Sequence, residues 1–169
     1  MKSNKFSLQE NSKIPEFVGA IIQDKQGRIL VSQRSLRSKM YPGQWQIPGG
    51  KVEKDENSLK ALKREVKEET NLEVISAEPL IALRYNSNVL IYLVQTQGKP
   101  KTMEPEKLNT GWIYIEVNEL KKMAIIPALA ELLKKQDKNF NLNKKQELEE
   151  IFAAWGVNIK TLHDLKEKN

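Results

Sequence analysis

Three carboxylates fall within about one turn of a predicted helix, at Glu65, Glu68 and Glu69. At about 100° of rotation per residue, they cluster on one face of that helix. Carboxylates this close repel one another, which costs helix stability unless a positive charge lies among them. Magnesium takes oxygen ligands and commonly joins carboxylates to the phosphates of a substrate. The spacing therefore predicts a cation site that faces a phosphorylated molecule.

The helix that carries these acids is predicted to begin near residue 58. Asn57 or Ser58 is suited to cap it, because both side chains accept hydrogen bonds from backbone N–H groups. Leu59, Leu62 and Val66 recur at helical spacing and mark the face that packs on a core. The acids lie on a second face beside this one. Packing of the apolar face therefore decides where the carboxylates point.

Two glycines, Gly49 and Gly50, precede the helix and allow backbone to approach the carboxylates closely. A plainer interpretation is that the acidic face is solvated, since runs of charge usually lie on the surface. The acids would then pair with the basic residues of the same helix, which are Lys60, Lys63, Arg64 and Lys67. The helix alone does not decide between the two.

The spacing of residues before and along the helix favours the cation site over a solvated face. Gly50, Glu56 and the run 64–69 (REVKEE) resemble the signature of the Nudix hydrolases at every charged position. One residue departs from that pattern, because Asn71 stands where the family has a second glycine. The position follows the helix and requires a positive φ, which Asn tolerates better than other non-glycine residues. We therefore expect the departure to leave the chemistry intact.

Composition excludes several other classes of site. The chain of 169 residues contains no cysteine, so disulfides, thiolate nucleophiles and Cys-ligated zinc are ruled out. Its single histidine, His163, lies near the C-terminus, away from the acids, and we expect a surface residue there. The net charge of +6 favours anionic partners. Because the basic residues are scattered, nucleic acid is the minor alternative to a nucleotide.

No apolar run in the sequence approaches the roughly 18 residues of a membrane span, and the first thirteen residues lack an apolar signal segment. We therefore expect a cytoplasmic protein that does not enter the membrane.

The remaining elements are predicted from periodicity. They are strands at 16–23, 28–33, 72–85, 88–96 and 112–117, and helices at 118–122 and 127–135. The first two strands flank the turn 24–27 and are predicted to pair as a hairpin. Strands interleaved with helices indicate an α/β fold. Residues 35–46 form a basic loop, in which Trp45 either contacts substrate or packs.

Beyond residue 136 the composition changes, which predicts a domain at 14–136 and a C-terminal helical extension at 137–169. The extension carries an apolar helix face formed by Leu148, Ile151, Phe152 and Trp155. This face is expected to dock on the domain's own surface, with a dimer contact as the alternative. The chain is accordingly predicted to be a monomer or a homodimer.

Within the family, the chain looks most like the MutT-type nucleoside triphosphate pyrophosphohydrolases, since residues 45–53 (WQIPGGKVE) resemble their entry into the signature. The resemblance implies a Nudix-type α/β/α sandwich with a mixed central sheet. It also implies a magnesium site, with manganese as an alternative ion. The implied ligands are Glu65, Glu68, Glu69, an additional acid at Glu106, and the carbonyl of Gly49.

The resemblance extends to catalysis and substrate binding. The implied catalytic residues are Glu68, Glu69, Glu106 and Arg64, with Glu104 the rival of Glu106 and Arg64 pairing with Glu56 to orient helix and loop. The implied substrate contacts are Arg34, Trp45, Gly50 and Leu129. Leu129 stands where members that select oxidised guanine read the base with an asparagine. Because leucine offers no hydrogen bond, we expect only modest selection among bases.

The predicted activity is magnesium-dependent cleavage of a nucleoside triphosphate to the monophosphate and pyrophosphate, or of a nucleoside diphosphate linked to another group. One alternative is removal of a cap or 5′ diphosphate from RNA, which the positive charge favours. The other is a Nudix fold used as a ligand sensor without catalysis. Retention of all three metal-binding glutamates favours an enzyme.

Overall fold

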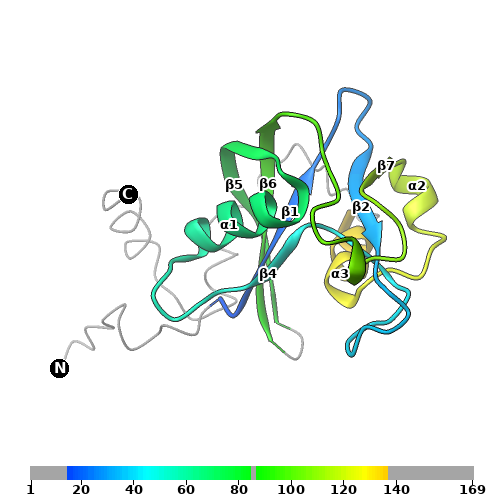
Figure 1. Cartoon of the computed structure of the whole chain (residues 1–169), viewed down its shortest axis with the longest axis horizontal. Helices are drawn as coiled ribbons and strands as arrows, with labels where there is room; N and C mark the ends of the chain where they lie inside the picture. Colours follow the sequence, from blue (N-terminus) through cyan, green and yellow to red (C-terminus); the bar gives the residue numbers. More distant parts are fainter. Residues whose placement is uncertain (1–14, 85–86, 137–169) are drawn as a thin grey trace.

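The computed structural model describes residues 15–84 and 87–136, which form two sheets and their helices (Figure 1). The strands are β1 (Phe17–Ile22), β2 (Ile29–Gln33), β3 (Trp45–Gln46), β4 (Gly49–Lys51), β5 (Glu73–Arg84), β6 (Asn88–Gln97) and β7 (Ile113–Ile115). The helices are α1 (Ser58–Thr70), α2 (Val117–Leu120) and α3 (Pro127–Gln136), with a 3-10 turn η1 (Pro105–Lys107). The strands and helices expected between residues 15 and 136 are all present, with boundaries shifted by a few residues.

The larger sheet has the strand order β4-β1-β6-β5 and is mixed. Its central strand β1 pairs parallel with β6 and antiparallel with β4, and β5 pairs antiparallel with β6. The smaller sheet has the order β3-β2-β7. A mixed central sheet was expected, and it is confirmed.

The expected hairpin between the first two strands is wrong. β1 and β2 meet at a single bridge, Gln23 to Ile29, beyond which β2 enters the smaller sheet. The turn itself forms as expected, because Oδ1 of Asp24 accepts from the N–H of Arg28 at 2.9 Å. β1 pairs with β6 along its whole length and with β4 over Phe17–Gly19, whereas β2 pairs with β3 and β7 in the smaller sheet. Local alternation could not reveal these pairings.

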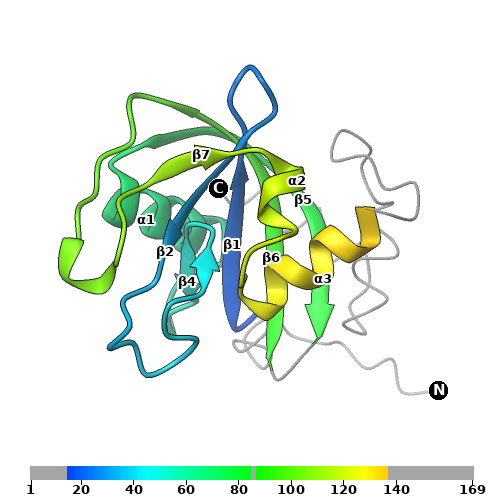
Figure 2. The same ribbon diagram turned by 90° about the vertical axis from the view of Figure 1, so that its right-hand side faces the viewer.

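Side chains of β1 alternate between two apolar cores, as the pleat of a strand requires. Val18, Ala20 and Ile22 belong to the core beneath α1, whereas Ile21 belongs to the core beneath α2 and α3. Figure 1 shows the larger sheet with α1 on one side and with α2 and α3 on the other, and Figure 2 shows α3 crossing β6 and β5. This is the expected α/β/α sandwich.

Both ends of α1 are capped by asparagine. The side chain of Asn57 accepts from the N–H of Lys60 at 2.9 Å, which satisfies a donor of the first turn. Asn71 adopts a left-handed conformation with φ of 60°, and its N–H donates to the carbonyl of Lys67 at 3.0 Å. Both features were expected. They define where the helix that carries the acids begins and ends.

The C-terminal extension at 137–169, with its apolar helix face and His163, lies outside the described residues. Within the part that is described, no helix is both long enough and apolar enough to cross a membrane.

Candidate active site

Backbone of the glycine pair lies directly against the acidic face of α1. Antiparallel pairing places Gly49 beside Gly19 and Gly50 beside Val18, and the N–H of Gly49 donates to Oε2 of Glu69 at 2.9 Å. A Cβ at Gly49 would lie 2.2 Å from the carbonyl oxygen of Val18. The absence of a side chain is therefore what lets this strand approach both β1 and the helix.

Gly50 serves the same purpose for a second acid. A Cβ built on it would lie 2.4 Å from the carboxyl group of Glu65. The two glycines thus bring backbone up to two of the predicted metal-binding glutamates, Glu65 and Glu69. The spacing of glycines and glutamates along the chain is the signal that found this arrangement.

Arg64 organises the acids through a fork of five hydrogen bonds. Its Nε and Nη2 donate to Glu56 at 3.1 and 2.6 Å, and Nη2 also donates to the carbonyl of Lys51 at 3.0 Å. Its Nη1 donates to Glu65 at 2.8 Å and to Glu68 at 3.3 Å. The expected ion pair between Arg64 and Glu56 is present. Because Arg64 spans helix and loop, it fixes the position of Glu65, and we interpret it as a positioning residue.

The electrostatic environment differs among the three acids. Removal of its carboxyl from water, with the nearby charges of Glu65 and Glu104, raises the pKa of Glu69 to about 8, although the Gly49 N–H and Lys107 oppose the shift. Desolvation likewise raises the pKa of Glu65 against the opposing effect of Arg64. Glu68 is the exposed member, with 54% of its side chain accessible. A cation near Glu65 and Glu69 would relieve an unfavourable charge.

The groups that could bind a metal ion here are all carboxylate and backbone oxygens. Magnesium and manganese prefer such oxygen ligands. Residues 15–84 and 87–136 contain no group of three acidic side chains already close enough together to hold an ion. Arg64 accounts for this, since it draws Glu65 and Glu68 toward itself while Glu69 turns to Gly49. The chemistry of these oxygen ligands fits a divalent cation.

The last turn of α1 is anchored from the other side by the segment that follows β6. Nε1 of Trp112 donates to the carbonyl of Glu69 at 2.9 Å, and the N–H of Met103 donates to the same oxygen at 3.4 Å. The N–H of Lys101 donates to the carbonyl of Thr70 at 2.8 Å. Carbonyls that a helix leaves unpaired at its end are thus satisfied, and Glu69 is held at both backbone and side chain.

A cavity of about 450 Å³ opens beside Glu69. It is lined by Arg34, Ser35, Arg37, Ser38, Lys39, Met40, Gln46, Glu69, Glu104, Glu106, Lys107, Leu108 and Trp112. Four of the residues weighed from the sequence therefore meet here, namely Arg34, Glu69, Glu104 and Glu106. Of the two rival acids, Glu104 is the one whose charge raises the pKa of both Glu65 and Glu69.

Arg34 is one of the cations that line the cavity. Its Nε donates to the carbonyl of Met40 at 2.9 Å, and its Nη1 donates to Oε1 of Gln46 at 2.6 Å. Nε2 of Gln46 reaches the fully buried Ser32 hydroxyl at 3.4 Å. The guanidinium is therefore held in place by protein groups.

Gly50, a predicted substrate contact, lies against Glu65 and does not line the cavity, and two further predicted contacts lie elsewhere. Leu129 is fully buried in the core beneath α3, so it has no surface with which to touch a base. Trp45 is half-buried, packs against the same core, and exchanges backbone hydrogen bonds with Ala124 and Ile126. Neither lines the cavity. Their roles in binding stay predictions that this geometry does not support, because the strand position of Trp45 and the inward face of α3 were not fixed by the motif.

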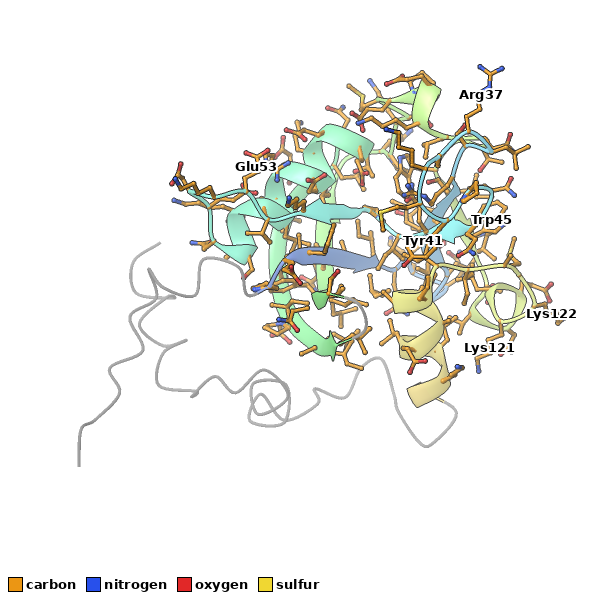
Figure 3. The ribbon with its side chains drawn as sticks, turned by 90° about the horizontal axis from the view of Figure 1, so that it is seen from below. Arg37, Tyr41, Trp45, Glu53, Lys121 and Lys122 are labelled. Atoms are coloured by element: carbon orange, nitrogen blue, oxygen red, sulfur yellow. The ribbon has the colours of Figure 1, made fainter. Side chains whose placement is uncertain are left out.

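Sequence reasoning missed Gln46 and Lys107, and it did not single out Arg37 and Lys39 within the basic loop. Gln46 follows Trp45 on the opposite face of β3, so alternation along this strand could have directed attention to it. Lys107 sits one residue after Glu106, and the 3-10 turn at 105–107 is what brings it to the cavity. Figure 3 shows Arg37 extending outward from its loop.

Comparisons with known proteins agree with this geometry. The chain is 44% identical over 66 residues to the CTP pyrophosphohydrolase of Escherichia coli (strain K12), a match covering 39% of this chain and 47% of the relative. It is 43% identical over 54 residues to the 8-oxo-dGTP diphosphatase of Proteus vulgaris, covering 32% of this chain and 47% of that protein. The chain thus spans about half the length of these curated relatives.

Solved structures and a family model extend the match. A MutT NUDIX hydrolase from Burkholderia pseudomallei superposes with a TM-score of 0.63 at 25% identity, covering 70% of this chain and 94% of that one. MutT from Aliivibrio salmonicida and Vibrio cholerae gives a TM-score of 0.63 at 23% identity over 74% of this chain and 98% of that one, which supports the fold. The NUDIX domain model matches residues 14–136. With the glycine pair, the arginine fork and the acidic helix face in place, the chain belongs to the Nudix family.

Proposed function

We propose that this protein is a pyrophosphohydrolase that uses a divalent cation, magnesium or manganese, to cleave nucleoside triphosphates into nucleoside monophosphate and pyrophosphate. The observation that carries the proposal is the approach of Gly49 and Gly50 to the carboxylates of Glu69 and Glu65, beside a cavity lined by both acids and cations. The names of the relatives, which are hydrolases of CTP and of 8-oxo-dGTP, support nucleoside triphosphates as the substrate class.

The cation would be held by Glu65, Glu68 and Glu69 together with the carbonyl of Gly49. When bound, such an ion polarises phosphoryl oxygens, neutralises developing charge and lowers the pKa of a coordinated water. The protein's own contribution is to hold the ligands. Arg64 fixes Glu65, and the Gly49 N–H and Trp112 fix Glu69 from opposite ends of the residue.

A carboxylate at the cavity would accept the proton of the attacking water. The water oxygen bonds to the α-phosphorus, the bond from that phosphorus to the bridging oxygen breaks, and pyrophosphate leaves with the electron pair. Glu104 is our choice for the proton acceptor, since it lines the cavity and its charge acts on both Glu65 and Glu69. Glu106 lines the same cavity and is the alternative.

Turnover of a substrate panel, measured with magnesium and with EDTA, tests the proposal. The panel comprises dGTP, 8-oxo-dGTP, CTP, a nucleoside diphosphate sugar, a dinucleoside polyphosphate and capped RNA, with products separated by chromatography. We expect release of pyrophosphate from triphosphates only when the cation is present. Tight binding without any turnover would instead favour a ligand sensor, and selective release of a cap would favour the RNA alternative.

The same panel tests base selection. With Leu129 buried and apolar, no hydrogen bond from that position reads the base. Shape alone supplies about 1–3 kcal/mol of discrimination. We expect kcat/KM for 8-oxo-dGTP and dGTP to differ by less than about 10³-fold. A larger ratio would mean that another polar side chain, such as that of Gln46, reads the base.

The choice between the two acids is tested by Glu104→Gln and Glu106→Gln. We expect Glu104→Gln to lower kcat by about 100-fold, as is usual for a lost general base, and Glu106→Gln to have the smaller effect. The reverse order would assign the proton transfer to Glu106.

A further inference from the structure

Two cations at the cavity have no partner in the described structure. Arg37 and Lys39 both line it, and their side chains form no hydrogen bond or ion pair with any residue in 15–84 or 87–136. The other two cations of the cavity are already engaged. Arg34 is bound to Met40 and Gln46, and Lys107 is paired with Glu104 at 2.6 Å. The unneutralised charge is therefore concentrated at two neighbouring positions of one loop.

The loop that carries these cations, residues 34–44, is held in a defined shape. It runs between β2 and β3, and Nε2 of Gln33 donates to the carbonyl of Gly43 at 2.9 Å. The N–H of Ser35 donates to the carbonyl of Lys107 at 3.0 Å, which ties the loop to η1. Figures 1 and 2 both show the loop projecting past the sheets beside this 3-10 turn. Arg37 and Lys39 are thus presented at a fixed edge of the cavity.

A tight turn closes the loop and adds to its rigidity. Gly43 has a φ of 70°, and the N–H of Gln44 donates to the carbonyl of Tyr41 at 3.3 Å across Pro42. This is the pattern of a type II turn, in which Pro and Gly occupy the two central positions. A rigid loop loses little entropy when it binds a ligand, so its charges bind an anion more effectively.

The acids of the cavity and its two unpaired cations come from different segments of the chain, and Lys107 lies among the acids, where it pairs with Glu104. Glu69, Glu104 and Glu106 come from α1 and the segment before β7, whereas Arg37 and Lys39 come from the loop after β2. Phosphate at the acidic side requires a cation to mediate its binding. Phosphate at loop 34–44 requires none, because unpaired guanidinium and ammonium groups bind it directly.

We propose that Arg37 and Lys39 form a subsite for the phosphates that lie beyond the scissile bond, so that the enzyme favours substrates with at least three phosphates in a chain. The inference rests on the proposed function, because it assumes that the scissile phosphate lies at the carboxylates. The α-phosphate then sits at the acidic side, and the β- and γ-phosphates extend toward the loop. A nucleoside diphosphate, which lacks the γ-phosphate, reaches the subsite less well.

The kinetic test compares dGTP with dGDP. The double variant Arg37→Ala/Lys39→Ala is expected to reduce the triphosphate-over-diphosphate ratio of kcat/KM by about 10-fold, since a hydrogen bond to a charged group accounts for at least that factor. The control is Lys121→Ala/Lys122→Ala, which removes the same charge from residues that do not line the cavity and should leave the ratio unchanged. An unchanged ratio in the loop variant overturns the proposal. An equal fall in the control variant also overturns the proposal, because the effect would then come from the overall positive charge of the protein and not from Arg37 and Lys39.

A binding test separates this proposal from the proposed function. Inorganic tripolyphosphate is titrated calorimetrically into the protein in metal-free buffer, where the carboxylates repel it and the cations alone attract it. We expect the Kd to rise about 10-fold in Arg37→Ala/Lys39→Ala and to be retained in Arg37→Lys/Lys39→Arg. If the wild type binds tripolyphosphate through these residues but hydrolyses no nucleotide, the subsite stands and the hydrolase assignment falls. Equal affinity in the wild type and the alanine variant, with circular dichroism showing both folded, overturns the subsite.

Discussion

The acidic face of α1 and the basic loop 34–44 are built in opposite ways. On α1, Arg64 binds Glu65 and Glu68 while the N–H of Gly49 binds Glu69, so all three glutamates of this face are held by protein groups. On loop 34–44, backbone hydrogen bonds fix the path of the chain, but the side chains of Arg37 and Lys39 have no partner in the described residues. If the proposed function holds, the glutamates of α1 serve the chemistry and the loop serves binding. Substitutions in the two regions should therefore affect different kinetic constants.

The largest effect is expected from Glu69→Gln and Glu68→Gln. Each should lower kcat by at least about 100-fold, because each removes a charged ligand of the cation while leaving the apolar face of α1 intact. Turnover of dGTP in magnesium measures this, and circular dichroism checks the fold. Glu119→Gln, on the exposed surface of α2, is the control and should retain full activity. Near-normal turnover in either active-site variant would refute the metal assignment.

The acidic face of α1 could be predicted because residues close together in the sequence determine it. Glu65, Glu68 and Glu69 share a helix, and the period of that helix alone places them on one face. The glycine pair and Arg64 lie at fixed sequence offsets before these glutamates, so one motif specifies all of these residues. Even the departure at Asn71 could be interpreted, since its φ of 60° follows from its place after the helix.

The next effect is expected from Arg64→Lys. A lysine keeps the charge but cannot bridge Glu56, Glu65 and the Lys51 carbonyl together, so half-buried acceptors lose their donors. We expect the free energy of unfolding to fall by about 1–3 kcal/mol, measured by urea denaturation, and kcat to fall by about 10-fold or more.

The matched control for this prediction is Lys67→Ala on the same helix. Lys67 pairs with Glu73, and both side chains are about half exposed, so the pair should contribute less than about 1 kcal/mol. Equal destabilisation by the two variants would mean that Arg64 contributes only a surface ion pair.

The loop side could not be predicted to the same depth, for a physical reason. Nothing in residues 35–46 indicates which basic side chains face a cavity, because that depends on the contact of Ser35 with Lys107, 72 positions away in the sequence. The same limit explains why the sequence did not place Leu129 in the core and why the β1–β2 hairpin was wrong. In each case a choice between two faces or two pairing partners was made by distant segments, as tertiary contacts commonly override local pattern.

A smaller effect is expected from Trp112→Phe, which keeps an aromatic ring at a position only 8% exposed. Phenylalanine cannot donate to the carbonyl of Glu69, which retains only the longer bond from Met103. We expect a loss of about 1 kcal/mol in unfolding free energy and a fall in kcat of about 3- to 10-fold. A lower melting temperature with unchanged kcat would mean that Trp112 supports the core and does not position Glu69.

The smallest effect is expected at Asn71. It tests whether residues near in the sequence are enough to set the acidic face of α1. Its left-handed conformation ends α1 two residues after Glu69, and its N–H donates to the carbonyl of Lys67. Glycine adopts this conformation without strain, so Asn71→Gly should leave stability unchanged or raise it by up to about 1 kcal/mol. Asn71→Val should lower it, because a β-branched side chain strongly disfavours positive φ. Thermal melts give the order, and kcat of both variants should match the wild type once they are folded. A Val variant that melts above the Gly variant would mean that the side chain at this position, and not its backbone, determines how the helix ends.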